Sequence, residues 1–112
     1  MPLLIIKTNC PVEDKINLAL AASRETATAL SKPESYVMVN IEDSQALVFA
    51  GSEQPAAYLE LKSLGLPEAK TAEISATLCT FIQEKLDIDP ARIYIEFSNA
   101  ERHMWGWKGA TF

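Results

Sequence analysis

The most distinctive chemical group in this sequence is expected at position 2. Met1 precedes Pro2, and an initiator methionine is usually removed when the second residue is small. Removal would expose the secondary amine of Pro2 at the start of the apolar run Leu3–Ile6. An α-amino group titrates near about 7.7–8.0 in water, and an apolar site or a nearby cation lowers its pKa, because the protonated form carries the charge. Pro2 is therefore a candidate general base, although by itself it equally fits a proline at the edge of a first strand.

Other reactive groups are few and poorly spaced. The chain has one histidine, His103, and its two cysteines, Cys10 and Cys79, lie far apart in the sequence and are expected to be reduced thiols. Neither a metal-ligand cluster nor a glycine-rich phosphate or dinucleotide motif is present, so we expect no metal and no cofactor. Glu60 and Glu96 resemble a carboxylate pair, but with Lys62 nearby they are more typical of a solvated charge network.

Length and charge narrow the classes of partner. The 112 residues suffice for one domain, residues 1–112, and not for two. Ten Lys and Arg against fifteen Asp and Glu give a net charge of −5, which disfavours nucleic acid and anionic membranes as partners. No apolar run approaches the roughly 20 residues of a membrane span, and no secretion signal is evident, so we expect a cytoplasmic protein.

The sequence contains an internal repeat. Residues 3–41 and 59–97 each read as a strand, a helix and a second strand, with the helical run ended at Lys32-Pro33 and at Asp89-Pro90. A helical crossover normally joins parallel neighbouring strands. The repeat therefore predicts an α+β fold of two β-α-β units, with a four-stranded mixed sheet and two helices on one face. Residues 46–51 and 105–107 are predicted to form further short strands.

Hydrophobic spacing predicts which faces are buried. The first helix is expected to bury a stripe at three- and four-residue spacing, comprising Val12, Ile16, Ala19, Leu20, Ser23, Ala27 and Leu30. The second is expected to bury Ile74, Leu78, Phe81, Ile82 and Leu86. In the first strand Leu3 to Ile6 are apolar on both faces, whereas two helices cover one face. We therefore expect another copy of the chain to cover the second face, in preference to this chain's own loops.

Five segments spread along the chain together carry a family resemblance. They are MPLLIIKTNCP, SKPESYV, LKSLG, PARIYIEF and GWKGATF. In this order and at these distances they resemble the macrophage migration inhibitory factor family of the tautomerase superfamily, from Met1 to Phe112. The resemblance implies a homotrimer with active sites between subunits, and a cofactor-free isomerase. Its expected reactions are keto–enol tautomerisation of phenylpyruvate-like aromatic keto acids and isomerisation of dopachrome.

The resemblance also assigns roles to individual residues. Pro2 matches the family's catalytic proline, and Lys32 matches the lysine that pairs with the substrate carboxylate. Leu64 matches an isoleucine whose backbone meets the substrate, and Tyr94 matches a tyrosine contributed by the neighbouring subunit. The residues matching the aromatic wall around the substrate are Tyr36, Trp107 and Phe112. Without the resemblance, Lys32 reads as a helix C-terminal cation and the aromatic residues as ordinary packing.

Departures from the family pattern bear on specificity. Glu96 stands where animal members have a substrate-binding asparagine, and an ionised carboxylate accepts hydrogen bonds but does not donate them. If Glu96 lies close to Pro2, its charge favours the protonated amine. Lys62 replaces a histidine and Trp105 a valine, which predicts a bulkier and differently charged pocket mouth. The family's C-x-x-C motif is absent from residues 55–59, so thiol–disulfide activity is not expected.

Two other classes of function remain open. One is a cytokine-like, protein-binding trimer in which the pocket is a relic. The other is an enzyme that uses Pro2 as a nucleophile or Lys32 as a Schiff-base former, in decarboxylation or hydration of unsaturated acids.

Overall fold

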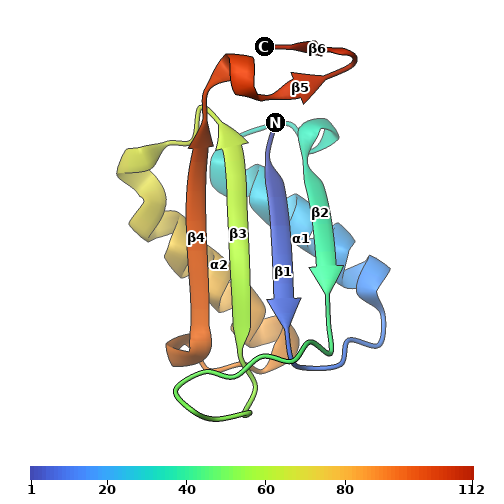
Figure 1. The fold of residues 1–112 in the computed structure, drawn as a ribbon, viewed down its shortest axis with the longest axis vertical. Helices are drawn as coiled ribbons and strands as arrows, with labels where there is room; N and C mark the ends of the chain where they lie inside the picture. The colour runs from blue at the N-terminus through green and yellow to red at the C-terminus, as the bar shows by residue number, and fades with distance from the viewer.

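Four long strands and two helices make up most of the chain (Figure 1). The computed structural model describes all residues from Met1 to Phe112. The strands are β1 (Leu3–Thr8), β2 (Met38–Glu42), β3 (Ala57–Leu64) and β4 (Ile93–Ala100), with two short strands, β5 (Gly106–Trp107) and β6 (Ala110–Thr111); the helices are α1 (Lys15–Leu30) and α2 (Thr71–Leu86). Short 3₁₀ turns cover Glu34–Tyr36, Glu68–Lys70, Pro90–Arg92 and Arg102–Met104.

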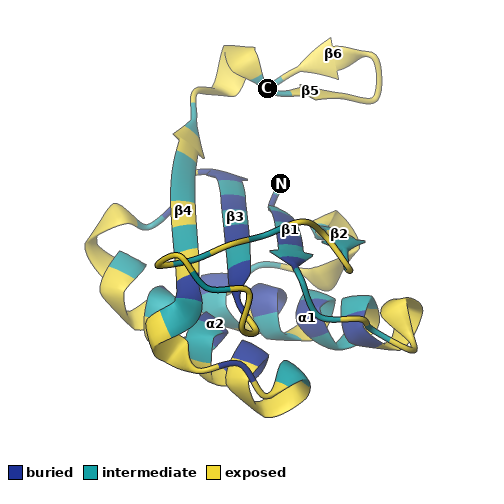
Figure 2. Ribbon diagram, turned by 60° about the horizontal axis from the view of Figure 1, so that its bottom comes forward, coloured by how far each residue is buried: buried dark blue, intermediate teal, exposed yellow.

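The sheet has the duplicated topology that the repeat predicts. Its strand order is β2-β1-β3-β4, with β1 parallel to β2, β3 parallel to β4, and β1 antiparallel to β3. Each half is therefore a parallel β-α-β unit, and the two halves meet at the β1–β3 pair. Both helices lie against the same face of the sheet, as Figure 2 shows from below. The predicted α+β fold class is confirmed.

Both helices end in the same local conformation. Ser31 after α1 and Asp87 after α2 adopt left-handed backbone angles, with φ of 53° and 55°. Their N–H groups bond back to carbonyls of the last helical turn, a common way to satisfy the groups left unpaired at a helix end. Pro33, with φ −61° and ψ 136°, then directs the chain into an extended path. The predicted helix ends at the two prolines are thus confirmed to within a few residues.

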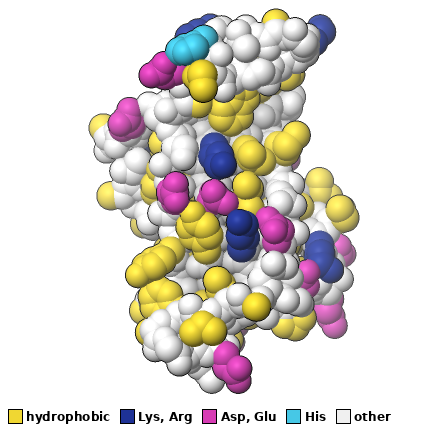
Figure 3. All heavy atoms as spheres, in the orientation of Figure 1, with side chains coloured by type: hydrophobic (Ala, Val, Ile, Leu, Met, Phe, Trp, Pro, Cys, Tyr) yellow, Lys and Arg dark blue, Asp and Glu magenta, His cyan; other side chains and the backbone are white.

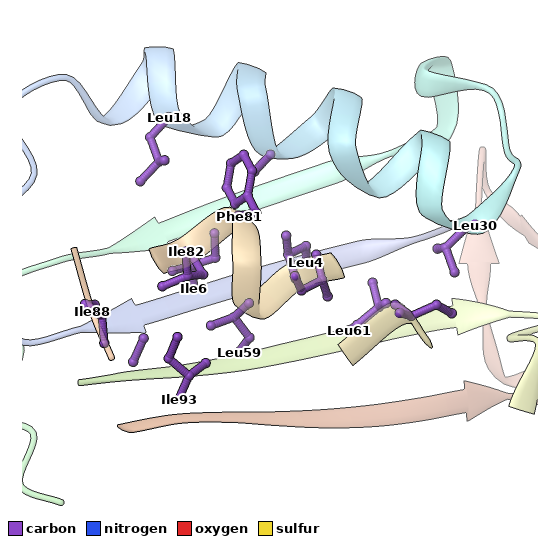
Figure 4. Packing of buried hydrophobic residues seen from close by; sticks show 14 of the residues in the cluster. Leu4, Ile6, Leu18, Leu30, Leu59, Leu61, Phe81, Ile82, Ile88 and Ile93 are labelled. Carbon is purple, nitrogen blue, oxygen red and sulfur yellow. The ribbon is translucent and has the colours of Figure 1, made fainter. Parts of the chain in front are cut away.

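The core lies between the helices and one face of the sheet (Figure 4). Side chains alternate along the strands, so Leu4 and Ile6 of β1 and Leu59 and Leu61 of β3 are completely buried. The second helix buries the predicted stripe, with Leu86 only partly covered. On β4, Ile93 faces the helices while Tyr94 is 64% exposed on the other face. The alternation of side chains along each strand accounts for both facings.

The prediction for the first helix was right for Ala27 and Leu30 and wrong for its larger apolar residues. Val12 precedes α1, which starts at Lys15 after the Asp14 side chain accepts a hydrogen bond from the Asn17 N–H. Ile16 and Leu20 are 73% and 52% exposed. The buried positions are Leu18, Ala22, Thr26, Ala27 and Leu30. Small residues occupy much of this face, and a pattern weighted by large apolar side chains does not detect it.

The two predicted extra strands had different outcomes. Residues 46–51 form no strand, and only a single bridge joins Phe49 to Ser52. That loop is held by Arg92, whose guanidinium donates to the carbonyls of Phe49 and Ser52 at 3.1 and 3.0 Å. The C-terminal prediction is confirmed, since Gly106–Trp107 pairs with Ala110–Thr111 in a hairpin. Lys108 and Gly109 turn this hairpin with φ of 54° and 79°, as a two-residue type I′ turn requires.

The sheet face opposite the helices carries alternating charges. Glu60 forms ion pairs with Lys7 and Lys62 at 3.6 and 3.7 Å. Figure 3 shows acidic and basic side chains gathered over the middle of the sheet. Leu3 and Ile5 on this face are only half-buried. Covering of this face by another copy of the chain stays a prediction.

Cys10 and Cys79 are free thiols, and burial raises the pKa of the Cys79 thiol. No three His, Cys, Asp or Glu side chains are grouped so as to hold a metal ion. Neither helix has the length and apolar character needed to cross a membrane.

Two buried threonines provide a test of the packing. The Thr26 hydroxyl in α1 is buried without a hydrogen-bond partner, whereas the Thr8 hydroxyl donates to the Ala56 carbonyl at 2.8 Å and accepts from the Cys10 N–H at 3.1 Å. Thr26→Val removes an unpaired polar group and should raise the free energy of unfolding by about 1 kcal/mol. Thr8→Val leaves two backbone groups unpaired and should lower it by about 1–3 kcal/mol. Urea unfolding of both variants checks the pair, and equal changes in the two would contradict this description.

Candidate active site

Pro2 is fixed at the beginning of the central strand β1. Its carbonyl accepts a hydrogen bond from the Met38 N–H at 3.0 Å, which ties it to the start of β2. The Pro2 side chain is almost completely buried. It lines a cavity of about 390 Å³, called here the proline cavity, whose other residues are Met1, Leu3, Ser35, Tyr36, Val37, Met38, Trp105, Gly106 and Trp107.

Lys32 is held at the end of the helical crossover from β1 to β2. Its N–H bonds to the Ala27 carbonyl at 2.9 Å, so the backbone completes the end of α1. Its Nζ donates to the Leu64 carbonyl at the end of β3, at 3.0 Å. The ammonium therefore interacts with the end of β3 and does not serve merely as a cation at its own helix end. Gly65 follows Leu64 with φ +59°, a conformation that disfavours residues with a Cβ.

Lys32 and Leu64 line a second cavity with the predicted aromatic residues. This lysine cavity, also about 390 Å³, is lined by Met1, Lys32, Pro33, Tyr36, Leu64, Arg102, Trp107 and Phe112. The two cavities are neighbours, because three residues line both of them: Met1, Tyr36 and Trp107. Five of the predicted site residues therefore line the lysine cavity, and Pro2 lines the adjoining proline cavity. The five are Lys32, Leu64, Tyr36, Trp107 and Phe112.

The aromatic wall is built by ring contacts between the C-terminal hairpin and the 3₁₀ turn Glu34–Tyr36. Trp107 stacks on Phe112, with ring centroids 5.8 Å apart and planes 11° apart. It also meets Tyr36 edge to face at 6.2 Å and 83°. Figure 1 shows the hairpin lying over the end of the sheet where the chain begins. These contacts fix the three rings as an aromatic lining of the lysine cavity, which suits an aromatic ligand.

The electrostatics of this end of the molecule favour a neutral amine. The pKa of the Met1 amine lies below its ordinary value, first because burial disfavours the charged form and second because the Lys32 ammonium repels it. A larger fraction of such an amine is unprotonated at neutral pH. Neither cavity is lined by an acidic side chain that would reverse this effect.

Tyr94 and Glu96 lie apart from both cavities in the single chain. They are on β4, on the open face of the sheet. Tyr94 meets Phe49 edge to face at 4.9 Å. Glu96 accepts a 2.7 Å hydrogen bond from the Tyr58 hydroxyl, which with burial and the charges of Glu60 and Glu96 raises the pKa of Tyr58 to about 12. Their contribution to a neighbouring subunit's site stays a prediction, and Glu96 does not line the Pro2 cavity of its own chain.

Of the two residues predicted at the mouth of the pocket, Lys62 and Trp105, only Trp105 lines a cavity of its own chain. Trp105 lines the proline cavity as predicted. Lys62 lies instead on the open face of the sheet, paired with Glu60.

Two residues that line the cavities, Met38 and Arg102, were not predicted from the sequence. Met38 was detectable in principle, because parallel pairing sets it beside the beginning of β1, whereas the place of Arg102 depends on a 3₁₀ turn with no clear sequence signal.

The fold and the site together define a class of small α+β proteins. Its features here are a duplicated β-α-β unit, a buried proline just before an inner strand, and a lysine and an aromatic wall nearby. The comparison with family models places the chain within that class. The model "Macrophage migration inhibitory factor (MIF)" matches residues 1–112, and the chain belongs to this family.

Individual relatives agree over their full lengths. The chain is 40% identical to the macrophage migration inhibitory factor homolog of Brugia malayi over 115 residues, covering 100% of this chain and 99% of that protein. It is 38% identical to the homolog of Trichinella spiralis, covering both chains completely. The crystal structure of the homologue from Prochlorococcus marinus superposes with a TM-score of 0.92 at 38% identity, covering 98% of each chain. The family resemblance seen in the sequence is confirmed.

The effect of Lys32 on the terminal amine is directly measurable. In protein that retains Met1, Lys32→Met removes the repelling charge and should raise the pKa of the Met1 amine, while its burial still keeps that pKa below the ordinary value. The pH dependence of acetylation, followed by mass spectrometry of the N-terminal peptide, measures this pKa. Lys15→Met is the control, because Lys15 pairs with Asp43 at 3.5 Å outside both cavities. An unchanged midpoint in Lys32→Met, or an equal rise in Lys15→Met, would contradict the account.

Proposed function

We propose that this protein is a keto–enol tautomerase for phenylpyruvate-like aromatic keto acids and for dopachrome, with the amine of Pro2 as the general base. The observation that carries the proposal is the position of Pro2. It is buried beside a cavity at which burial and the Lys32 ammonium lower the pKa of the Met1 amine, and next to a second cavity that holds a lysine ammonium and three aromatic rings.

The arrangement supports a proton shuttle by one base. The substrate carboxylate pairs with Lys32, whose ammonium has two N–H groups left after donating to the Leu64 carbonyl. The neutral Pro2 amine takes a proton from the carbon between the carbonyl and the ring. The electron pair moves onto the carbonyl oxygen, and the protonated amine returns the proton to that oxygen to give the enol. No covalent bond to the protein forms, and no cofactor is needed.

Charge and packing supply the remaining requirements. Negative charge develops on the oxygen next to the carboxylate, where the Lys32 ammonium stabilises it in surroundings partly shielded from water. The substrate ring lies against Trp107 and Phe112. Both interactions orient the reacting carbon toward the amine, which is the larger part of what a binding site contributes to such a reaction.

The proposal extends to a homotrimer whose active sites lie between subunits. Tyr94 and Glu96 are exposed on the open face of β4, where another copy of the chain would meet them. Each would then complete the site of the adjacent subunit. A carboxylate at position 96 favours substrates that donate a hydrogen bond from the distal end of the ring, such as phenols.

Replacing the proline tests the base. Pro2→Gly keeps a terminal amine after methionine removal, but a primary and less constrained one, and should lower turnover of phenylpyruvate by at least about tenfold. Ultraviolet absorbance of the enol follows the reaction. Pro11→Gly, in an exposed loop outside both cavities, is the matched control and should keep full turnover. Equal turnover in Pro2→Gly and the unchanged protein would contradict the proposal.

Retention of Met1 provides an independent test with no side-chain change. With Met1 in place the Pro2 nitrogen is an amide and has no basicity, so that fraction of the protein should be inactive. Intact mass identifies the two forms, and chromatographic separation allows each to be assayed.

Incubation with phenylpyruvate and borohydride should leave the mass of the protein unchanged, because proton transfer forms no carbon–nitrogen bond. A mass increase would instead favour Schiff-base chemistry.

A further inference from the structure

Two glutamates lie side by side on the open face of the sheet. Glu60 of β3 is directly opposite Glu96 of β4 in the parallel register. Like charges in such cross-strand positions repel each other, so each carboxylate needs a partner that offsets the repulsion. Glu60 has two, because it pairs with the ammonium groups of Lys7 and Lys62 at 3.6 and 3.7 Å. Glu96 forms no ion pair within the chain.

The partner of Glu96 is a phenol. The Tyr58 hydroxyl donates to Glu96 Oε2 at 2.7 Å, a length typical of a charge-assisted hydrogen bond. Tyr58 is opposite Tyr94, so Glu96 is its diagonal neighbour, two residues further along β4 and within reach of a long side chain. This is the one hydrogen bond that the Glu96 carboxylate accepts within the chain. The Tyr58 hydroxyl therefore holds Glu96 in place.

Tyr58 is itself well fixed. It lies on β3, which pairs with β1 on one edge and with β4 on the other. The Lys7 ammonium is 5.9 Å from the centroid of its ring, in the range of a cation–π contact. The hydrogen bond to Glu96, then burial and the charges of Glu60 and Glu96, raise the pKa of Tyr58 to about 12. At neutral pH Tyr58 is thus always the donor, and Glu96 the acceptor.

The Glu96 carboxylate keeps free acceptor sites. A carboxylate offers about four lone-pair positions, and Tyr58 uses one of them on Oε2. Glu96 is exposed, and no lysine neutralises it. An ionised carboxylate that is held in place and has no cation partner is a strong acceptor for a neutral donor such as a phenol.

We propose that Tyr58 is a positioning residue for substrate specificity, which holds the Glu96 carboxylate so that it accepts a hydrogen bond from a hydroxyl at the distal end of the substrate ring. This inference rests on the proposed function, in which Glu96 completes the site of the adjacent subunit. Tyr58 acts on the substrate through Glu96 alone. The preferred substrate class is a keto acid with a 4-hydroxyphenyl ring.

Loss of the Tyr58 hydroxyl should release Glu96 to a competing partner. Lys62 is opposite Ser98, which makes Lys62 the other diagonal neighbour of Glu96 across the strand pair. In Tyr58→Phe the Lys62 ammonium is free to be shared between Glu60 and Glu96. A carboxylate turned toward Lys62 is less available to a substrate hydroxyl, so the preference for that hydroxyl should fall.

Binding of three unreactive probes tests the role of Tyr58. Phenylacetate, 4-hydroxyphenylacetate and 4-fluorophenylacetate have no keto group to enolise, and only the second carries a distal donor. The protein freed of Met1 should bind 4-hydroxyphenylacetate at least about fivefold more tightly than the other two. Tyr58→Phe should reduce this preference to less than about twofold and leave the affinity for phenylacetate within about twofold. Calorimetry measures all three affinities.

A double-mutant cycle separates positioning from direct contact. Glu96→Ala should abolish the preference for the hydroxyl, and addition of Tyr58→Phe should then change nothing further, because Tyr58 acts through Glu96. Thermal unfolding and sedimentation compare fold and assembly among the variants. A further loss in the double variant would overturn the inference, as would a full preference in Tyr58→Phe or none in the unchanged protein.

Titration of the phenol tests the hydrogen bond without a change at Tyr58. Near pH 11 an ordinary tyrosine, with a pKa of about 10, is mostly ionised, whereas Tyr58 in the unchanged protein should remain mostly neutral. In Glu96→Ala the pKa of Tyr58 should fall toward 10.0, because its largest cause is removed. Carbon-13 NMR of labelled tyrosine rings follows the ionisation. An unchanged titration of Tyr58 in Glu96→Ala would overturn the inference.

A turnover comparison distinguishes this inference from the proposed function. Tyr58→Phe should lower kcat/KM at least about fivefold for 4-hydroxyphenylpyruvate, chiefly through KM, and by less than about twofold for phenylpyruvate. Turnover of both keto acids with no difference in their dependence on Tyr58 would overturn this inference and leave the tautomerase proposal standing. A Tyr58-dependent preference for the hydroxyl in binding, without turnover of either keto acid, would overturn the tautomerase proposal and support this inference.

Discussion

The pairing of β1 on both of its edges is the constraint on which the site depends. A strand at the centre of the sheet is held along its whole length, so the residue before it is placed as firmly as the core. The hydrogen bond from the Met38 N–H to the Pro2 carbonyl extends that pairing to position 2. Because α1 has 16 residues, about 24 Å of helix, it returns the chain from the end of β1 to its beginning. Lys32 and Tyr36 therefore arrive beside Pro2 as a consequence of the crossover.

The charges follow from the same geometry. The ends of α1 and β3 meet at one corner, where the Leu64 carbonyl holds the Lys32 ammonium. An ammonium in a part-buried corner with no acidic side chain lining the cavity lowers the pKa of a neighbouring amine and attracts an anion. In the proposed mechanism basicity and substrate binding are linked, because the Lys32 ammonium, which together with burial lowers the pKa of the terminal amine, would also pair with the substrate carboxylate.

Much of this arrangement was predictable from the sequence, for reasons that differ between elements. Along β3 and β4 the alternation of side chains accounts for the buried faces, whereas β1 is apolar on both faces and only the structure shows that Leu4 and Ile6 face the helices. In the first helix the apolar spacing predicted Ala27 and Leu30 correctly, but it missed Ala22 and Thr26 and wrongly placed Ile16 and Leu20 on the buried face. The segment 46–51 contains strand-forming residues, yet Arg92 contacts hold it as a loop. Propensity has little weight where contacts distant in sequence decide the conformation.

The candidate site was predictable only through its resemblance to a family. Neither composition nor spacing brings Lys32, Leu64 and Phe112 together, because they meet through the topology and through a hairpin of two-residue strands. No sequence pattern predicts that Arg102 lines a cavity, because backbone hydrogen bonds within the C-terminal segment determine its position. Tyr94 and Glu96 illustrate the opposite case, in which the family pattern assigns a role that one chain by itself does not fulfil.

The most direct test of the account is a nitrogen-15 NMR titration of the Pro2 amine in protein labelled with proline and freed of Met1. The terminal nitrogen should titrate as a single group with a midpoint below the roughly 7.7–8.0 of an ordinary α-amino group, because Pro2 is buried and the Lys32 ammonium that lowers the pKa of the Met1 amine lines the adjoining cavity. A midpoint at or above that range would show an amine that is protonated at neutral pH, and would contradict the claim that the fold keeps a base ready at the beginning of β1.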